Sequence, residues 1–320
     1  MKMSRRTKKV LITSSIVLSL LVVAGGYYGI HYLYDYAIAR NDKSFMSSGE
    51  ASGTDEKEEA ISQWDFLKGK PKVWTQQTED GLKLKGTLLE NPEQKNNKTK
   101  KVLVLVHGYT SNSRLLKQYA KLFYQHGYTL FLPDARGHGQ SEGDYIGFGY
   151  PDRIDLIAWL NRLTTYYHHH LDIGLWGISM GAAEVMMATG EKLPQEVKCV
   201  IEDCGYTSTK DELAYQLDEM FHLPEFPIIP LASAYTDYKA GYNFYESDAV
   251  AALKKNYLPM LFIHGDKDTF VPTKMVNTLY KATKGPKEKM IFQGASHAKS
   301  YASHSKKYEQ LCINFLNKYM

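Results

Sequence analysis

A serine flanked by glycines is the first feature of this sequence that could do chemistry. Residues 177–181 read Gly-Ile-Ser-Met-Gly, after an apolar run at 173–176 and before a run of small residues with helical character. A G-x-S-x-G turn between a strand and a helix holds the serine hydroxyl in an exposed, strained position. We therefore expect Ser179 to be presented for nucleophilic attack, with the N–H of Met180 placed to stabilise an oxyanion. The alternative is a glycine turn that contains a serine by chance.

A serine hydroxyl becomes a nucleophile only when a base accepts its proton and a carboxylate orients that base. Two later segments supply such groups in the chain order Ser…Asp…His that is typical of this kind of turn. Residues 264–272 (HGDKDTFVP) contain two aspartates, and residues 294–297 (GASH) end at His297. Each segment follows its own strand-like run, so both are expected at the carboxyl edge of one sheet.

The segments that would position these residues alternate between strand and helix. A continuous apolar run such as VLVLV is typical of a strand buried on both faces of a parallel sheet. The expected strands are 73–77, 82–89, 102–106, 128–132, 173–176, 197–201, 260–263 and 289–292, and the expected helices are 115–126, 152–166, 181–189 and 301–318. The first two strands flank a Glu-Asp-Gly turn and are expected to form an antiparallel hairpin. The pattern predicts an α/β fold with a mostly parallel central sheet and helices on both faces.

One segment interrupts this alternation. Residues 206–257 contain no good strand and are rich in Tyr, Phe and Pro. An insertion of this length at the carboxyl ends of the strands is expected to form a helical cap over the ligand crevice. Its apolar side chains suit either a hydrophobic substrate or a small core of the cap itself.

The N-terminal segment has the composition of a membrane anchor. Residues 10–30 carry no charge, and at ~1.5 Å per residue they span ~32 Å, enough to cross a hydrocarbon core of ~30 Å. The basic residues before them predict a cytoplasmic tail at 1–9, a transmembrane anchor at 10–34 and an extracellular remainder. The alternative is a cleaved signal peptide and a secreted protein, although the apolar region of such a peptide is normally ~7–15 residues long.

A polar linker is expected at 35–63, because residues 41–62 are rich in Gly, Ser and charged residues and almost free of aromatic ones. The folded domain is then expected at 64–320. The net charge of the chain is +4, but five basic residues lie before the first acidic residue. Without these five, the rest of the chain has a net charge of about −1. A nucleic-acid-binding protein should spread its basic residues over its folded part, and this class is therefore excluded.

The cysteines and a histidine cluster do not indicate a disulfide framework or a metal site. Cys199 and Cys204 lie in one expected strand, ~16 Å apart and on opposite faces, so they cannot bridge each other. Cys312 is expected to be a packed thiol. The three adjacent histidines at 168–170 cannot easily converge their rings on one ion and have no carboxylate or cysteine partner nearby.

The chain resembles the α/β-hydrolase superfamily over about residues 75–320. Within it, the chain is similar to the serine-hydrolase branch of bacterial esterases, lysophospholipase-like enzymes and serine-aminopeptidase-type members. The segments that carry the resemblance are LVHGY at 105–109, DARGHGQSEG at 134–143, the turn at Ser179, the Asp268 turn and His297. This resemblance implies that Ser179 is the nucleophile, His297 the general base and then acid, and Asp268 the orienting carboxylate.

Two other carboxylates are candidates for the orienting role. Asp203 is the usual alternative position in the superfamily, and Asp266 is expected to stabilise a turn. Asp268 is favoured because it fits a His-Gly-x-x-Asp pattern before a Val-Pro turn. The resemblance also implies that the N–H of Tyr109 is the second oxyanion donor. Some lipases have a glycine where this chain has Tyr109. The tyrosine side chain narrows the site and therefore disfavours esters of bulky tertiary alcohols.

The expected function is that of an exported, membrane-tethered serine hydrolase that cleaves carboxylic esters through an acyl-enzyme. The expected substrate is a small-molecule or lipid-like ester, and the membrane is contacted through the N-terminal helix. No cofactor and no metal are implied. The alternatives are a peptidase or amidase and an acyltransferase that use the same triad, and a non-catalytic scaffold on the same fold.

Overall fold

A computed structural model describes residues 5–41 and 64–320 of the chain. It contains one eight-stranded sheet with the strand order β1-β2-β4-β3-β5-β6-β7-β8. The strands β1 and β2 form an antiparallel hairpin, β2 runs antiparallel to β4, and the other neighbours are parallel. The strands are β1 (Lys72–Gln77), β2 (Lys83–Leu89), β3 (Lys100–Val106), β4 (Thr129–Pro133), β5 (Leu171–Ile178), β6 (Val197–Asp203), β7 (Met260–Gly265) and β8 (Lys287–Phe292). The predicted fold class is confirmed.

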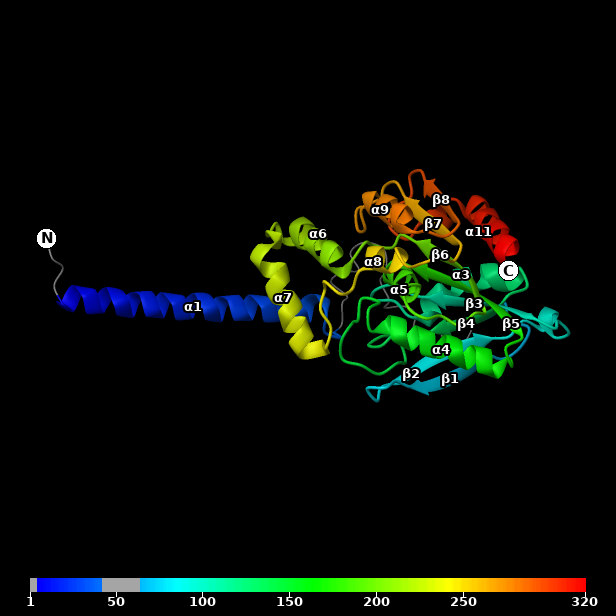
Figure 1. Cartoon of the computed structure of the whole chain (residues 1–320), viewed down its shortest axis with the longest axis horizontal. Helices are drawn as coiled ribbons and strands as arrows, with labels where there is room; N and C mark the ends of the chain where they lie inside the picture. The colour runs from blue at the N-terminus through cyan, green and yellow to red at the C-terminus, as the bar shows by residue number, and fades with distance from the viewer. Residues whose placement is uncertain (1–4, 42–63) are drawn as a thin grey trace.

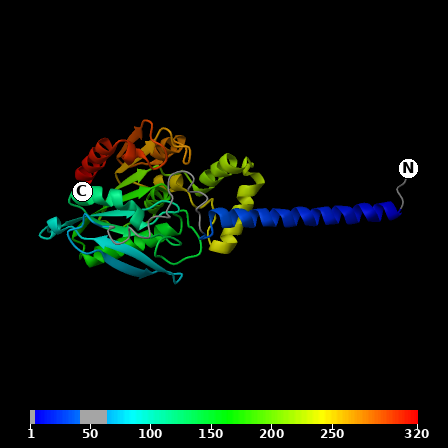
Figure 2. The ribbon, with the colours of Figure 1, turned by 180° about the vertical axis from the view of Figure 1, so that it is seen from behind.

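The helices cover both faces of the sheet, as predicted (Figures 1 and 2). They are α1 (Arg5–Ala37), α3 (Lys117–Gln125), α4 (Asp152–Tyr166), α5 (Met180–Ala188), α6 (Thr209–Phe221), α7 (Glu225–Ala240), α8 (Ala249–Leu253), α9 (Lys274–Ala282), α10 (Ser300–Ser303) and α11 (Ser305–Tyr319). Short 3₁₀ turns occur at Pro92–Gln94 and Ser113–Leu116. Several details differ from the sequence prediction; among them, α9 was not predicted, and the expected helix at 301–318 is divided into α10 and α11.

The apolar run of β3 shows why the sheet needs helices on both sides. Successive side chains of a strand point to opposite faces. Val102, Val104 and Val106 belong to the core layer that includes residues of α4, α5, α8 and α9. Leu103 and Leu105 belong to the other layer, with residues of α3 and α11. All five side chains are buried, so the run could not face water on either side.

The cap consists mainly of α6 and α7, between β6 and β7. The hydroxyl of Ser208 accepts a hydrogen bond from Asp211 N at 3.0 Å and so caps the start of α6. At the other end, α7 stops at Gly241, whose left-handed backbone (φ 73°) favours glycine. Both helices thus lie within the insertion expected at 206–257.

The N-terminal helix α1 is longer than the predicted anchor. Its stretch Leu11–Ala37 is long enough to cross a membrane and contains an 18-residue segment with a mean hydropathy of 1.8, and most of α1 stands clear of the domain (Figures 1 and 2). The helix continues through residue 35, where the linker was expected to begin. Beyond its end, Ile38 is buried, and Arg40 donates to the carbonyls of Ser141 (2.8 Å) and Gly139 (3.1 Å). Residues 35–40 are therefore attached to the domain, whereas 42–63 lie outside the described residues.

Candidate active site

Ser179 lies at the sharp turn where β5 ends and α5 begins. Its backbone has φ 56° and ψ −119°, a strained conformation for a residue with a side chain. The turn is held by neighbouring backbone groups, since Ser179 N donates to Asp203 O at 2.8 Å and Ser179 O accepts from Ala183 N at 3.1 Å. Such an arrangement fixes the position of the hydroxyl before any reactant binds.

The two glycines beside Ser179 are required by close backbone approaches. A Cβ at Gly177 would lie 2.2 Å from Gly181 O, and a Cβ at Gly181 would lie 2.3 Å from Val106 O. Any side chain at these positions would force β3, β5 and α5 apart. The G-x-S-x-G pattern therefore reflects a real packing demand here, rather than an incidental turn.

The structure brings Ser179, His297 and Asp268 together at the carboxyl edge of the sheet. Ser179 Oγ lies 2.9 Å from His297 Nε2, and His297 Nδ1 lies 2.8 Å from Asp268 Oδ2. The other carboxylate oxygen, Oδ1, accepts hydrogen bonds from the N–H groups of Phe270 (3.0 Å) and Val271 (2.9 Å). With its Nδ1 proton directed to the carboxylate, the imidazole has Nε2 available to accept the serine proton.

Asp268 has a second histidine partner that the sequence analysis did not identify. The buried His264, at the end of β7, has its Nε2 atom 3.2 Å from Asp268 Oδ2 and 2.9 Å from Val271 O. Burial alone raises the pKa of the Asp268 carboxyl, but the hydrogen bonds from His264 and His297 outweigh it and lower the pKa to about 2. The carboxylate is therefore ionised throughout the neutral range. The signal was present in the His-Gly-x-x-Asp pattern, which begins with this histidine.

The two competing carboxylates have other partners. Asp266 Oδ1 accepts a hydrogen bond from Gly294 N at 2.6 Å, in keeping with the turn-stabilising role expected for it. Asp203 is buried and accepts a hydrogen bond from the hydroxyl of Tyr308 at 2.9 Å. Burial raises the pKa of Asp203 to about 7. Of the three aspartates, only Asp268 makes a hydrogen bond with His297 in the described part of the chain.

The two expected oxyanion donors flank the serine. A Cβ at Gly108 would lie 3.2 Å from Ser179 Cβ, so the turn before Tyr109 passes directly beside the nucleophile. Within residues 5–41 and 64–320, no group accepts a hydrogen bond from the N–H of Tyr109 or of Met180. His107 holds this turn from beneath, because its Nε2 accepts from Ala135 N at 3.0 Å and its Nδ1 lies 2.8 Å from Gly108 O. Two N–H groups placed beside the serine in this way are what the expected oxyanion hole requires.

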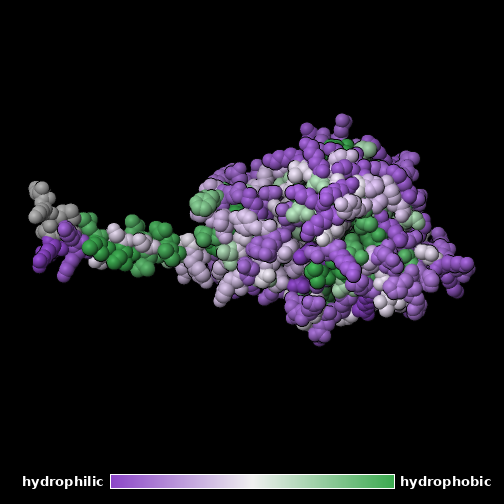
Figure 3. Space-filling model, in the orientation of Figure 1, coloured by the Kyte–Doolittle hydropathy of each residue, from purple (hydrophilic) through white to green (hydrophobic). Residues whose placement is uncertain are grey.

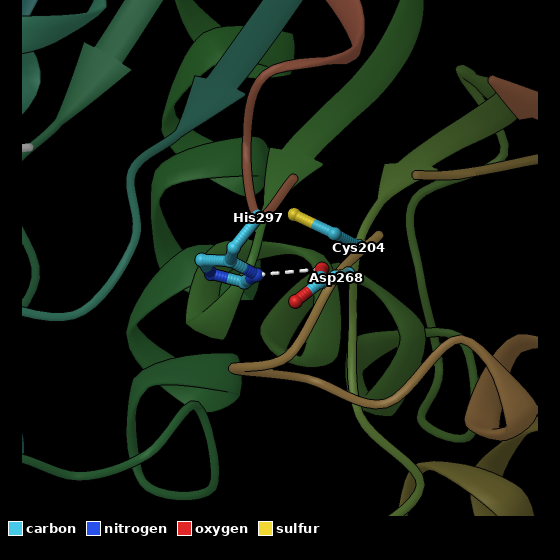
Figure 4. A group of neighbouring side chains, drawn as sticks. All are labelled: Cys204, Asp268 and His297. Carbon is cyan, nitrogen blue, oxygen red and sulfur yellow. Dashed lines mark hydrogen bonds and ion pairs between the residues drawn. The ribbon is translucent and has the colours of Figure 1, made fainter. Parts of the chain in front are cut away.

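Cys204 also lies close to the triad and raises the question of a metal site (Figure 4). One ligand atom from each of Cys204, Asp268 and His297 lies within 4.8 Å of the others. A thiol binds metals as the thiolate, but burial and the nearby Asp203 and Asp268 raise the pKa of Cys204 well above its usual value. With its thiol protonated and the other two groups hydrogen-bonded to each other, this trio is poorly suited to a metal.

The loop at 134–143 supports the site without joining it. Arg136 makes two hydrogen bonds to Asp155, at 2.8 and 3.0 Å, and one to Asp80 at 2.9 Å. These contacts tie the loop to α4 and to the β1–β2 turn. Contrary to the expectation for the cluster at 168–170, one of its histidines has a carboxylate partner, because the side chain of His169 pairs with Glu196 at 2.7 Å.

An apolar pocket of about 870 Å³, counting its open mouth, adjoins Ser179. Its walls come from the turn at Ser179, from the loop after β7, from both cap helices and, unexpectedly, from the end of α1. The α1 side of the wall consists of Leu33, Tyr34, Tyr36, Ala37 and the following Ile38. The phenol of Tyr109 donates a hydrogen bond to Ala37 O at 2.7 Å, so it packs against α1 beneath the cap.

Comparisons with known proteins agree with this architecture. Residues 97–220 match the family described as serine aminopeptidase, S33. The uncharacterized protein YqkD of Bacillus subtilis is 30% identical over 219 residues, which cover 68% of this chain and 72% of YqkD. An esterase from Pyrococcus furiosus is similar in structure, with a TM-score of 0.64 at 23% identity, over 80% of this chain and 93% of its own. An acylaminoacyl peptidase reaches a TM-score of 0.61 at 18% identity, over 78% of this chain and 41% of its own.

The strand order, the turn at Ser179 and these similarities lead to one assignment. The chain belongs to the α/β-hydrolase superfamily, and the solved structures share its fold.

Proposed function

We propose that this protein is an exported, membrane-anchored serine hydrolase that cleaves carboxylic esters through an acyl-enzyme. The observation that carries the proposal is the chain of contacts from Ser179 Oγ to His297 Nε2 (2.9 Å) and from His297 Nδ1 to Asp268 Oδ2 (2.8 Å). The export part rests on the basic residues before the uncharged stretch at 10–30, which favour a cytoplasmic N-terminus.

In the first half of the reaction, Ser179 Oγ attacks the acyl carbon while its proton passes to His297 Nε2. The negative charge that develops on the carbonyl oxygen is stabilised by the N–H groups of Tyr109 and Met180, each worth about 3 kcal/mol of transition-state stabilisation. The C–O bond to the alcohol then breaks, and His297 protonates the departing alcohol. Asp268 keeps the imidazole oriented and stabilises its charged form.

In the second half, water replaces the alcohol. His297 accepts a proton from the water, whose oxygen attacks the acyl carbon, and the bond to Ser179 Oγ breaks. The serine recovers its proton from His297, and the acid leaves. The enzyme returns to its starting state without a cofactor.

An amide substrate is the main competing proposal, because the matched family is described as serine aminopeptidase. An aminopeptidase must hold the protonated amine of its substrate, normally with a carboxylate. Among the described residues that line the pocket, Glu212 is the one carboxylic acid, and burial raises its pKa to about 8. It is therefore largely neutral at pH 7 and is a weak partner for an ammonium group. The apolar lining instead favours the acyl part of an ester.

The test compares ester and amide hydrolysis by the full-length protein in detergent. We expect turnover of p-nitrophenyl butyrate and octanoate, little or no turnover of alanyl p-nitroanilide, and covalent labelling by a fluorophosphonate probe. The variant Ser179→Ala should lose the labelling and about 10³-fold or more of the ester turnover, whereas Ser305→Ala, at an exposed serine, should retain both. Rapid anilide hydrolysis beside inert esters would establish the amidase, and equal labelling of Ser179→Ala would reject the triad.

A further inference from the structure

The end of α1 does more than attach the domain to a membrane, because it forms one wall of the pocket beside Ser179. Leu33, Tyr34 and Ala37 line this pocket together with residues of α6 and α7. The wall is held firmly in place. Tyr109 donates to Ala37 O at 2.7 Å, and the ring of Tyr36 packs against that of Phe221 with centroids 5.3 Å apart. A helix that served only as a tether would need none of these contacts.

The pocket runs along one face of α6 from the serine to the surface. The six α6 residues that line it recur at helical spacing: Glu212, Leu213, Gln216, Leu217, Met220 and Phe221. These positions cover ~14 Å of helix. Burial decreases along this path, since Glu212 and Leu217 are buried, Phe221 is half-buried and Met220 is exposed. The open end of the pocket therefore lies near the end of α6, beside α1.

The open end also lies at the level expected for the membrane surface. If the hydrocarbon core begins at residue 10, directly after Lys8 and Lys9, ~20 residues of helix carry α1 across it to about residue 30. Tyr27 and Tyr28 are exposed near this level, where tyrosines are enriched at membrane–water interfaces. The pocket wall begins at Leu33, which is about one helical turn beyond residue 30, where the hydrocarbon core is expected to end.

The cap reaches the same level. The ring of Tyr235, on α7, lies 6.1 Å from that of Tyr27 and 5.4 Å from that of Tyr34. In both ribbon views the turn between α6 and α7 is the part of the domain that extends furthest along α1 toward the N-terminus (Figures 1 and 2). Phe226 in this region is 77% exposed and Leu231 is 51% exposed. Hydrophobic side chains are visible on this end of the molecule, beside the apolar helix (Figure 3).

We propose that the substrate is a lipid ester of the bilayer, whose acyl chain leaves the membrane between α1 and the cap and lies in the pocket against the end of α1. This inference rests on the proposed esterase function and adds the source and class of its substrate. The apolar wall accepts the chain, while the ester reaches Ser179 at the inner end of the pocket. Exposed apolar side chains around an open pocket are typical of a surface that contacts a membrane. Entry from the membrane also spares the chain a passage through water, which costs ~0.8 kcal/mol per exposed CH₂.

The experiment uses the full-length protein in phosphatidylcholine vesicles. One substrate is 4-methylumbelliferyl oleate, which resides in the bilayer, and the other is 4-methylumbelliferyl butyrate, which dissolves in water. In Ala37→Trp and Ala232→Trp, a large side chain fills the pocket from α1 and from α7, respectively. We expect each variant to lower the ratio of oleate to butyrate turnover at least tenfold. Ala251→Trp, at an exposed position of α8 outside the pocket, is the matched control and should leave the ratio unchanged.

A second pair of variants tests entry from the bilayer. Phe226→Glu places a charge on the membrane-facing end of the cap and should lower the oleate-to-butyrate ratio about fivefold. Tyr257→Glu is the control and should not change the ratio. Tyr257 is 71% exposed, but it precedes β7 and so lies at the amino ends of the parallel strands, whereas the pocket lies at their carboxyl ends. Equal losses with both substrates in the tryptophan variants, or an unchanged ratio in Phe226→Glu, would overturn the inference. Failure of the esterase proposal would look different, because neither ester would then be hydrolysed and Ser179 would not react with a fluorophosphonate.

Discussion

Asp268 Oδ2 lies 2.8 Å from Nδ1 of His297 and 3.2 Å from Nε2 of His264, so one carboxylate oxygen contacts two histidines. Burial opposes protonation of His264, yet its hydrogen bond to Asp268 and the nearby Glu202 raise its pKa above the usual value. If Ser179, His297 and Asp268 form the proposed triad, His264 acts on it through Asp268, as a positioning residue. Its hydrogen bond to the carboxylate favours the ionised form of Asp268.

Replacing His264 tests this role. We expect His264→Ala to lower kcat for p-nitrophenyl butyrate by about 10–100-fold with little change in KM, because the carboxylate loses a donor and its orientation. His264→Gln, which keeps a donor at a similar position, should recover part of the loss. His126→Gln, at a surface histidine that pairs with Glu309, is the control.

The pH dependence separates positioning from a merely structural effect. In the wild type the pKa of Asp268 is lowered to about 2, so its charge persists until the pH falls well below the ordinary range of ~3.9 for aspartate. Without His264 this pKa should rise, and the carboxylate should be lost sooner on acidification. The ratio of kcat/KM between His264→Ala and wild type should therefore fall further as the pH decreases from 6 to 4. A constant ratio would contradict the positioning role.

The glycine at 181 gives a sharper prediction about the fold. A Cβ there would lie 2.3 Å from Val106 O and 2.5 Å from His107 O, both backbone atoms that cannot move without shifting β3. We expect Gly181→Ala to lower the free energy of unfolding by ~3 kcal/mol, or the melting temperature by roughly 6–12 °C. Thermal unfolding of the detergent-solubilised protein provides the measurement. Gly69→Ala should be neutral, because no atom lies within 4 Å of a Cβ at that position; a stable Gly181→Ala would show that the turn can relax.

Much of this architecture could be predicted from local sequence signals. The β3 run VLVLV and the glycines beside Ser179 each reflect a constraint that acts over a few residues, which is why the strands and the turn were found. The expected proximity of Ser179, Asp268 and His297 likewise follows from strands that end at one edge of a parallel sheet.

The parts that sequence patterns missed depend on contacts between distant segments. The composition of residues 41–62 suggested a polar linker at 35–63. In the structure, the charge of Arg40 is instead satisfied by carbonyl groups of residues 139–143, about a hundred positions away. No local pattern reveals such a partner. The same holds for the packing of α1 on the pocket.

Glu212 gives a prediction about pH and stability. Burial raises its pKa from 4.5 to about 8, so the folded protein binds this proton more tightly than the unfolded chain does. The stability contributed by this carboxyl is therefore complete below about pH 4.5 and is lost as the pH rises through about 8. Glu212→Gln removes the titration and retains an amide oxygen for the hydrogen bond from Gln216.

The melting temperature of Glu212→Gln relative to wild type should accordingly be higher at pH 9 than at pH 6. The other buried acids titrate in both proteins, so the difference between the two melting temperatures reports on the Glu212 carboxyl alone. Glu219→Gln, at an exposed position on the same helix, should show no such change with pH. An equal effect of Glu212→Gln at both pH values would mean that the carboxyl is ionised in the folded protein.

Tyr109 connects the expected oxyanion hole to α1, because its phenol donates to Ala37 O at 2.7 Å while the turn that precedes it passes beside Ser179. Tyr109→Phe retains the N–H and removes only the connection. The variant leaves Ala37 O without this donor, and we expect the free energy of unfolding to fall by ~1–3 kcal/mol. If ~1 kcal/mol of this loss reflects poorer positioning of the Tyr109 N–H in the transition state, kcat for p-nitrophenyl butyrate should fall about fivefold. Tyr245→Phe, at an exposed tyrosine, is the control. A lower melting temperature with an unchanged kcat would show that the phenol only packs α1 against the domain.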